Sequence, residues 1–171
     1  MTIAFQIFES PIGTLRLVAR GDQLVALHLP HGDLPPLDGV AKRTPILTET
    51  AKQLREFFAG ERTTFDLALA PNGTAFQRIV WQQLLAIPFG RTASYGEVAR
   101  AIGRPAASRA VGAANGRNPI AIIVPCHRVI GADGTLTGYG GGMPTKRWLL
   151  AHERRHTPAP QASLPQLGLD A

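Results

Sequence analysis

The first part of the chain alternates between apolar and polar residues with a period of two. Three such stretches lie within residues 2–29, separated by turn-forming residues at 10–13 and 20–23. Alternation of this kind predicts β-strands with one buried face, and the short separations predict tight connections between neighbouring strands. We therefore expect a three-stranded antiparallel meander, followed by an irregular, proline-rich connection over residues 30–47.

Further along the chain the apolar spacing becomes helical. A first helix is expected over residues 49–58, ending at Gly60. Two more helices are expected to begin after Thr74 and Ser94, because each is followed three positions later by the Gln or Glu of a capping box. A last helix is expected over residues 146–154. The predicted fold class is α+β, in which an N-terminal antiparallel sheet with a helix precedes a mainly helical C-terminal domain.

The helix after Ser94 is followed by a second short helix whose residues mostly have small side chains. The first helix ends at Gly103, and Arg104-Pro105 restarts the chain, since proline is tolerated in the first helical turn. Two short helices joined by a tight turn are typical of a helix-turn-helix. Six of the ten residues over 106–115 are Ala or Gly, and Arg109 projects from them as a single long cation. This helix can therefore approach another surface closely; packing inside the protein is the alternative interpretation.

A β-branched run and a glycine-rich segment follow the helix-turn-helix. Residues 120–124 are too few for a helix. Residues 131–142 lack the preceding strand and following helix of a phosphate-binding loop, so nucleotide binding is not predicted. They favour a backbone that lies close against a flat ligand, because glycine permits close approach.

Length and composition are those of a folded protein of one or two small domains. The 171 residues are 44% hydrophobic, and the apolar runs, such as residues 84–89, are far too short to span a bilayer. The N-terminal residues lack the layout of a signal peptide, so a cytoplasmic protein without membrane association is expected. Lys and Arg number 18 and Asp and Glu number 12, a net charge of +6 that favours a polyanion as partner.

Cys126 is the single cysteine of the chain, and His127 and Arg128 follow it. Because the thiolate is a far better nucleophile than the thiol, a reactive cysteine needs neighbours that favour deprotonation, and these two residues offer that. A buried, unreactive core cysteine is the alternative. Adjacent side chains do not face each other, so His127 is expected to take the proton from Cys126 through a bridging water.

Glu153 is the expected partner of His127. It lies three and four residues beyond Leu150 and Leu149, on their apolar helix face, and a half-buried carboxylate needs a partner. Such a contact would fix the imidazole tautomer and stabilise its charged form. Since the chain has no second cysteine and nothing that would cleave a thioether, one molecule is expected to react once.

No metal or cofactor is predicted. His28 and His31 are three residues apart, but no cysteine or carboxylate pair accompanies them at ligand spacing. We interpret both as surface or loop histidines.

These motifs resemble those of the O6-alkylguanine-DNA alkyltransferases, also called methylated-DNA–protein-cysteine methyltransferases. The likeness is strong from Gly73 to Glu153 and limited to the coarse layout before that. The residues that carry it are Ser94-Tyr95-Gly96-Glu97, Arg109-Ala110-Val111-Gly112, Asn118-Pro119, Pro125-Cys126-His127-Arg128-Val129, Tyr139 with Gly141-Gly142, and Trp148-Leu149-Leu150-Ala151-His152-Glu153.

The resemblance implies two domains and a repair function. A ribonuclease-H-like α/β domain is expected over residues 1–72 and a DNA-binding, alkyl-acceptor domain over 73–155; the aperiodic end, 156–171, is expected to be disordered. The implied reaction is direct damage reversal, in which the alkyl group of O6-alkylguanine, and also of O4-alkylthymine, passes irreversibly to Cys126 after base flipping. The partner is double-stranded DNA containing O6-alkylguanine. A monomer is expected, and cooperative binding is left open.

Site residues are implied position by position. The catalytic residues would be Cys126, His127, Glu153, Asn118 and Tyr95. In that family the asparagine braces the helix and the active-site turn, and the tyrosine turns the target phosphate and donates to purine N3. The helix with Arg109 would lie in the minor groove, and Arg109 would enter the base stack. The residues expected to contact DNA or the flipped base are Ala107, Ser108, Arg109, Ala110, Gly112, Arg128, Val129, Tyr139 and Gly140.

The chain departs from some family members at two positions. Gly140 and Ala121 stand where those members have serine and proline, so a wider pocket that accepts adducts larger than methyl is expected. Three other functions stay open as alternatives. A lesion-binding relative would lack Cys126, a cysteine hydrolase would need a histidine from elsewhere and a turnover path, and a transcription factor would need more base-reading side chains than the helix has.

Overall fold

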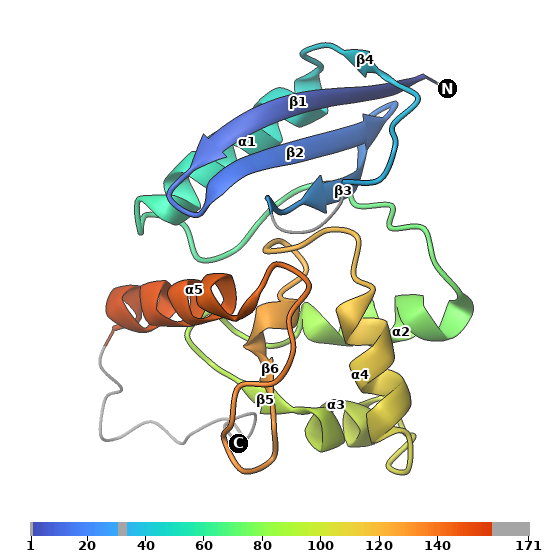
Figure 1. Ribbon diagram of the computed structural model, residues 1–171, viewed down its shortest axis with the longest axis vertical. Helices are drawn as coiled ribbons and strands as arrows, with labels where there is room; N and C mark the ends of the chain where they lie inside the picture. The colour runs from blue at the N-terminus through green and yellow to red at the C-terminus, as the bar shows by residue number, and fades with distance from the viewer. Residues whose placement is uncertain (1, 31–33, 159–171) are drawn as a thin grey trace.

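The computed structural model describes residues 2–30 and 34–158, with a sheet at one end of the molecule and most helices at the other (Figure 1). In chain order the elements are β1 (Ile3–Ser10), β2 (Gly13–Arg20), β3 (Gln23–His28), β4 (Val40–Ala41), α1 (Pro45–Phe58), α2 (Ala75–Leu84), β5 (Ala93–Ser94), α3 (Tyr95–Ala101), α4 (Ser108–Gly116), the 3-10 helix η1 (Cys126–Arg128), β6 (Val129–Ile130) and α5 (Met143–His156). The predicted α+β class is confirmed. Among the described residues, no helix is both long and apolar enough to cross a membrane.

The N-terminal sheet is the predicted meander with one strand added. β1 pairs antiparallel with β2, and β2 with β3. The first hairpin closes with Ser10 opposite Gly13, which has a φ of 113° that favours glycine. The short β4, within the stretch expected to be irregular, runs parallel to β1, so the strand order is β3-β2-β1-β4. Two residues are too few to produce a readable alternation.

Helix α1 begins earlier than predicted, at Pro45 instead of residue 49. Thr44 caps it, and its hydroxyl oxygen accepts a hydrogen bond from the backbone N–H of Leu47. Proline fits the first helical turn because the N–H that it lacks would have no partner within the helix. The proline-rich connection therefore ends in a helix start.

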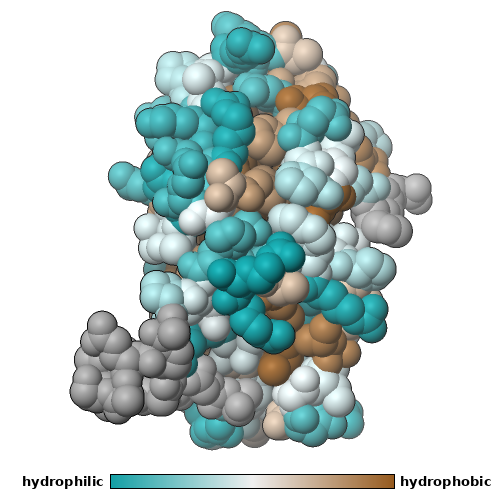
Figure 2. Space-filling view, turned by 90° about the vertical axis from the view of Figure 1, so that its left-hand side faces the viewer, coloured by the Kyte–Doolittle hydropathy of each residue, from teal (hydrophilic) through white to brown (hydrophobic). Residues whose placement is uncertain are grey.

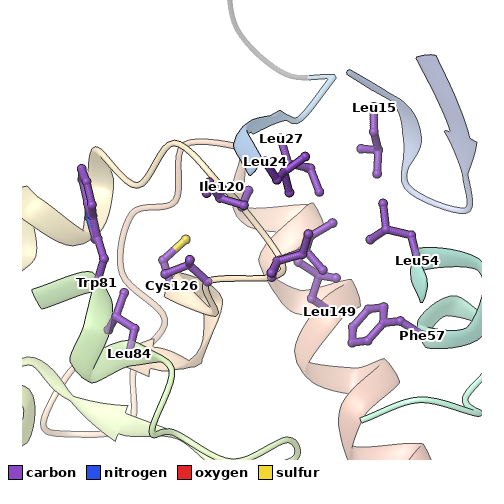
Figure 3. Packing of buried hydrophobic residues seen from close by; sticks show 14 of the residues in the cluster. Leu15, Leu24, Leu27, Leu54, Phe57, Trp81, Leu84, Ile120, Cys126 and Leu149 are labelled. Atoms are coloured by element: carbon purple, nitrogen blue, oxygen red, sulfur yellow. The ribbon is translucent and has the colours of Figure 1, made fainter. Parts of the chain in front are cut away.

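One apolar core extends through both halves of the molecule. Leu15 of β2 packs with Leu54 and Phe57 of α1, and the same cluster continues through Leu149 of α5 to Cys126 (Figure 3). Burial of each of these large apolar side chains stabilises the fold by about 1.5–3 kcal/mol. The N-terminal sheet and the cysteine therefore belong to one packed unit.

Strand β3, at the edge of the sheet, joins the two halves through its backbone. Leu24 donates to the carbonyl of Ala68 and accepts from the N–H of Ala70, both at 2.8 Å. The N–H of Leu27 donates to the carbonyl of Pro119 at 2.9 Å. An edge strand needs partners for its free backbone groups, and these contacts supply them. The segment that leads to Cys126 is thereby anchored on the sheet.

The capping boxes predicted at Thr74 and Ser94 are both present and open α2 and α3. Helix α4 begins later than expected, at Ser108. Pro105 therefore lies in the turn between the helices and not in α4. Two backbone hydrogen bonds close this turn: the N–H of Arg104 donates to the carbonyl of Ala99, and the N–H of Ala107 donates to the carbonyl of Arg104. The helix pair itself is present as predicted.

Helix α5 is longer than predicted at both ends, and Pro144 lies in its first turn. It includes His156, so the expected disordered tail does not begin there; residues 159–171 lie outside the described part of the chain. The Nε2–H of His152 donates to the carbonyl of Phe57 at 2.7 Å and ties α5 to α1. Arg147, Arg154 and Arg155 of this helix are exposed. Figure 2 shows one face of the molecule, on which hydrophilic residues predominate and apolar patches lie between them.

Candidate active site

Cys126 follows a strained turn that the sequence did not indicate. Residues 121–124 form this turn, and Ile122 has a φ of 73°, in the left-handed region. That conformation costs a β-branched residue on the order of 1–3 kcal/mol and persists only where the surroundings impose it. Ile122 is fully buried, which supplies that constraint. The turn delivers Cys126 to the start of η1, where its side chain is 5% exposed.

Asn118 holds the turn in place with its side-chain amide. Its Nδ2 donates to the carbonyl of Val124 at 2.8 Å and, more weakly, to that of Ile120 at 3.4 Å. Its Oδ1 accepts from the N–H of Ile120 at 3.0 Å. These contacts from one side chain to the backbone offset part of the strain of the turn.

His127 and Glu153 form a short buried contact. His127 Nε2 lies 2.6 Å from Glu153 Oε2, and both side chains are at most 1% exposed. Burial lowers the pKa of His127, and the charge of Glu153 opposes this only in part, so the imidazole is neutral near pH 7. An ionised carboxylate can only accept, so the proton resides on Nε2 and Nδ1 keeps its lone pair. Nδ1 is buried and has no hydrogen-bond partner among the described residues.

Glu153 is ionised despite its burial. Burial raises the pKa of Glu153, but the charge that His127 carries once it is protonated, the hydrogen bond from His127, and then the hydrogen bonds and charge of Arg128 outweigh this and lower the pKa to about 2. Four donors reach the carboxylate: His127 Nε2, Arg128 Nε at 2.8 Å, Arg128 Nη2 at 2.9 Å and the Gly90 N–H at 3.1 Å. A carboxylate with this many donors is held firmly in its charged form.

The expectation that Arg128 contacts DNA is wrong. Its side chain is buried, with Nε and Nη2 on Glu153 and Nη1 donating to the carbonyl of Ile87 at 2.7 Å. Although Arg128 is two residues from Cys126, it is not among the groups that shift the pKa of the thiol. Instead, the guanidinium forms an ion pair with the carboxylate of Glu153.

The cation that acts on Cys126 is Lys146, which the sequence reading did not select. Burial raises the pKa of the Cys126 thiol; a hydrogen bond from Asn118 and the charge of Lys146 lower it only in part. The thiol is therefore the resting form. Lys146 is fully buried, and its Nζ donates to the carbonyls of Val129 at 2.7 Å and Thr137 at 3.1 Å. Its spacing to Leu149, Leu150 and Glu153 places it on the same helix face, which was the available signal.

A cavity of about 150 Å³ opens onto Cys126. From the C-terminal half it is lined by Asn115, Gly116, Asn118, Pro119, Ala121, Cys126 and residues 138–141. The N-terminal half contributes residues 27–29, Leu34 and Pro35, although its sequence contains no chemical motif. Both departures from the family pattern, Gly140 and Ala121, lie in the wall. The hydroxyl of Tyr139 is buried near Cys126 without a hydrogen-bond partner among the described residues; burial, and then the charge of Cys126, raise its pKa well above the ordinary value.

The C-terminal end of α4 lines this cavity, and the exposed face of the helix lies nearer its start. Arg109 and Ala110 are exposed, and Ser108 and Gly112 are half-buried. Together with Tyr95 and Thr137, three of these residues (Ser108, Arg109 and Gly112) line a shallow surface hollow. Tyr95 hydroxyl lies 2.5 Å from Thr137 Oγ1, outside the Cys126 cavity itself. Val129 is fully buried, and its carbonyl accepts a hydrogen bond from Lys146.

The structure describes one of the two histidines of the N-terminal half. His28 Nδ1 accepts a hydrogen bond from Arg16 Nε at 3.0 Å, and His31 lies outside the described residues.

Two family models match this chain, one in each half. Residues 3–71 match the family described as 6-O-methylguanine DNA methyltransferase, ribonuclease-like domain. Residues 75–155 match the one described as 6-O-methylguanine DNA methyltransferase, DNA binding domain.

Known methyltransferases match this chain along most of their length. The methylated-DNA–protein-cysteine methyltransferase of Mycolicibacterium paratuberculosis is 51% identical over 158 residues, 92% of this chain and 96% of the relative. That of Methanosarcina acetivorans is 50% identical over 87% of this chain and 97% of its own. The crystal structure of Mycobacterium tuberculosis OGT in complex with DNA superposes with a TM-score of 0.84 at 49% identity, covering 91% of this chain and 96% of the other.

Proposed function

The chain belongs to the 6-O-methylguanine DNA methyltransferase family, and from this premise we propose that it repairs O6-alkylguanine in double-stranded DNA by moving the alkyl group to Cys126. It is a methylated-DNA–protein-cysteine methyltransferase that acts on alkylated DNA. One observation carries the choice of acceptor: the free thiol of Cys126 opens onto a cavity and is followed by a neutral histidine whose tautomer Glu153 fixes. The lesion-binding, hydrolase and transcription alternatives do not account for that combination.

The reaction begins with a proton. His127 Nδ1 takes the thiol proton of Cys126 through a bridging water, and Glu153 stabilises the imidazolium that forms. The thiolate then attacks the carbon bound to O6 of the flipped base; the C–S bond forms as the C–O bond breaks, and the electron pair of the C–O bond stays with the base. Tyr95 donates to purine N3 as guanine leaves, exchanging its contact with Thr137. The thioether is stable, so each molecule reacts once.

Helix α4 is the element that we place in the minor groove. Its exposed face is built from Ala, Gly and Ser around Arg109, and small side chains let the backbone come close to the sugar-phosphate edges. Arg109 fills the space that the flipped nucleotide leaves in the base stack. Asn118 keeps the active-site turn in register with this helix, and the backbone of Gly140 faces the base edge.

Several finer points belong to the same proposal. The protein acts in the cytoplasm, whose reducing conditions suit a free thiol, and as a monomer on DNA. O4-alkylthymine is the second substrate. An intact-mass measurement after incubation with an O6-methylguanine duplex tests the central step: one added methyl group per chain, mapped to the peptide with Cys126, is expected. Unmodified protein that has repaired many lesions per molecule contradicts it.

The pocket wall predicts tolerance of large adducts. Because Gly140 and Ala121 bring no bulky side chain to the cavity, transfer from O6-benzylguanine should stay within about tenfold of transfer from O6-methylguanine in the same duplex. Single-turnover rates measure this. Gly140→Ser is the matched variant and should slow the benzyl substrate more than the methyl one. A wild-type benzyl rate orders of magnitude below the methyl rate refutes the wider pocket.

Replacing Arg109 by alanine should slow repair of duplex DNA by on the order of tenfold to a hundredfold while leaving reaction with the free base O6-benzylguanine nearly unchanged. A free base needs no flipping, so the stacking role of Arg109 drops out of that reaction. Arg55→Ala is the control, since it removes the same charge from an exposed site on α1. Equal slowing of both substrates by Arg109→Ala contradicts the stacking role.

A further inference from the structure

Thr137 is the residue whose hydroxyl meets Tyr95, and the reaction proposed above only turns the Tyr95 O–H away from it. Thr137 Oγ1 lies 2.5 Å from the Tyr95 hydroxyl, at the short end of the range for a hydrogen bond between two hydroxyl groups. Each hydroxyl can both donate and accept, so the two oxygen atoms can stay in contact while the direction of the hydrogen bond reverses. The pair therefore has two hydrogen-bonded states.

Two segments that are far apart in the sequence bring this pair together. β5 pairs parallel with β6, and Tyr95 follows β5 directly, so the loop after β6 starts beside the first turn of α3 (Figure 1). The loop then folds back on itself, because the N–H of Gly131 donates to the carbonyl of Thr135 at 2.9 Å. The returning segment places Thr137 against Tyr95.

A buried cation holds the backbone of Thr137. Lys146 is fully buried, and its Nζ donates to the carbonyl of Thr137 at 3.1 Å and to that of Val129 at 2.7 Å. Moving Thr137 away from Tyr95 would take an acceptor from a buried ammonium group, which is unfavourable. The Thr137 oxygen is therefore held in place beside Tyr95, while its O–H can still rotate.

The pair lies on the surface where we place the DNA. Tyr95 and Thr137 are both half-buried and line the shallow hollow with Arg109 and Gly112 of α4. DNA bound along α4 would cover this hollow and exclude water from it. A hydrogen bond is electrostatically stronger where water is excluded, so the contact between the two hydroxyls gains strength in the complex.

The charge that develops on Tyr95 shows what the Thr137 hydroxyl can do. Because the electron pair of the breaking C–O bond stays with the base, purine N3 becomes more basic during the reaction. The Tyr95 O–H that donates to N3 is then polarised, and its oxygen gains negative charge. That oxygen no longer donates to Thr137, so the Thr137 O–H can turn and donate to it. A donor that is already aimed at a developing negative charge stabilises the transition state.

We propose that Thr137 is a positioning residue for alkyl transfer, whose hydroxyl donates a hydrogen bond to the Tyr95 oxygen and makes Tyr95 a stronger donor to purine N3. In this role Thr137 acts through Tyr95 and touches neither the base nor the sulfur. The inference rests on the proposed function, since it requires a flipped purine lesion whose N3 meets Tyr95.

A lesion without N3 tests it. Single-turnover rates are measured with O6-methylguanine and with 3-deaza-O6-methylguanine, which has a C–H group in place of N3, in the same duplex. Thr137→Val has nearly the shape of threonine but no hydroxyl, and it should slow the O6-methylguanine lesion by about tenfold, the effect of one hydrogen bond to a group that gains charge. The rate with the 3-deaza lesion should stay within about twofold, so the ratio of the two rates falls by about tenfold.

Thr137→Ser is the matched control. Serine keeps the hydroxyl and loses only a methyl group, so the rate ratio should stay within about twofold of the wild-type value. Tyr95→Phe removes the group through which Thr137 acts. Adding Thr137→Val to Tyr95→Phe should therefore change neither rate by more than about twofold, because residues that act as one unit have non-additive effects. Thr137→Ala takes the place of the valine variant if that protein does not fold, and the same drop in ratio is expected.

Equal slowing of both lesions by Thr137→Val overturns the inference and makes Thr137 only an anchor for the loop over residues 131–142. A valine variant that repairs O6-methylguanine at the wild-type rate overturns it too, as does a serine variant whose ratio falls as far as that of valine. A wild-type ratio near one also overturns it, because Tyr95 would then gain nothing from N3. Failure of the proposed function looks different, since wild-type protein would then gain no methyl group at Cys126 from the O6-methylguanine duplex.

Discussion

Replacing Cys126 by serine is expected to abolish alkyl transfer, with a loss of at least about 10⁴-fold in the single-turnover rate, while DNA affinity stays within about twofold. The serine hydroxyl fits the space of the thiol but is far less acidic, and its oxygen is a poorer nucleophile toward an alkyl carbon than sulfur. Burial already raises the pKa of the Cys126 thiol, which makes the transfer of its proton to His127 harder. A serine hydroxyl, which is a much weaker acid, would give up its proton still less readily. The side chain is almost fully buried, so its loss leaves the DNA-facing surface intact.

Rates with an O6-methylguanine duplex and affinities by fluorescence anisotropy measure the two parts of this prediction. Cys126→Ala provides the baseline, because alanine has no nucleophile at all. The serine and alanine proteins should be indistinguishable in transfer and should both still bind DNA. An alanine variant that transfers methyl at more than a tenth of the wild-type rate would show that another residue accepts the alkyl group.

Replacing Glu153 by glutamine should lower the free energy of unfolding by about 3–5 kcal/mol, the usual cost of leaving a buried cation without its anion. The Glu153 carboxylate accepts from His127, Arg128 and Gly90, and its side chain is 1% exposed. Glutamine has the same shape but no charge. Its NH₂ group can only donate, so it would face the N–H groups that now donate to the carboxylate and could not accept from them. Urea denaturation at pH 7 measures the change.

Two variants separate the charge network from a general effect of substitution. Glu61→Gln removes an exposed carboxylate and should change the stability by less than about 0.5 kcal/mol. Glu153→Leu combined with Arg128→Met removes both partners and should recover part of the loss, since no unpaired charge then stays buried. A loss below about 1 kcal/mol for Glu153→Gln would mean that the network contributes little.

The same network makes stability fall in acid. The pKa of Glu153 is lowered from 4.5 to about 2 in the folded protein, so its contribution is complete above 4.5 and is lost as the pH falls toward 2. The buried His127 acts in the same direction: its pKa lies below 6.5 when folded, so the unfolded chain binds that proton first. Wild-type stability should therefore decrease from about pH 6.5 downward. Glu153→Gln should show a flatter slope below pH 4.5, and equal slopes would contradict this origin.

The local chemistry of the chain determined much of the fold and the reactive group. Period-two alternation over residues 2–29 specified the strands, and the capping boxes at Thr74 and Ser94 specified helix starts, because these signals depend on residues a few positions apart. The helix-face argument for Glu153 placed a carboxylate in the core for the same reason. The Cys126 neighbourhood was readable because a motif of consecutive residues carries it.

Only the tertiary structure decided how the site is assembled. Arg128 turns to Glu153 and Ile87, and Lys146 becomes the cation near the sulfur. The N-terminal half, which has no chemical motif, closes one side of that cavity with residues 27–29 and 34–35. Each of these depends on where a side chain meets groups distant in sequence, and on burial that sets its charge, and neither is encoded in spacing along the chain.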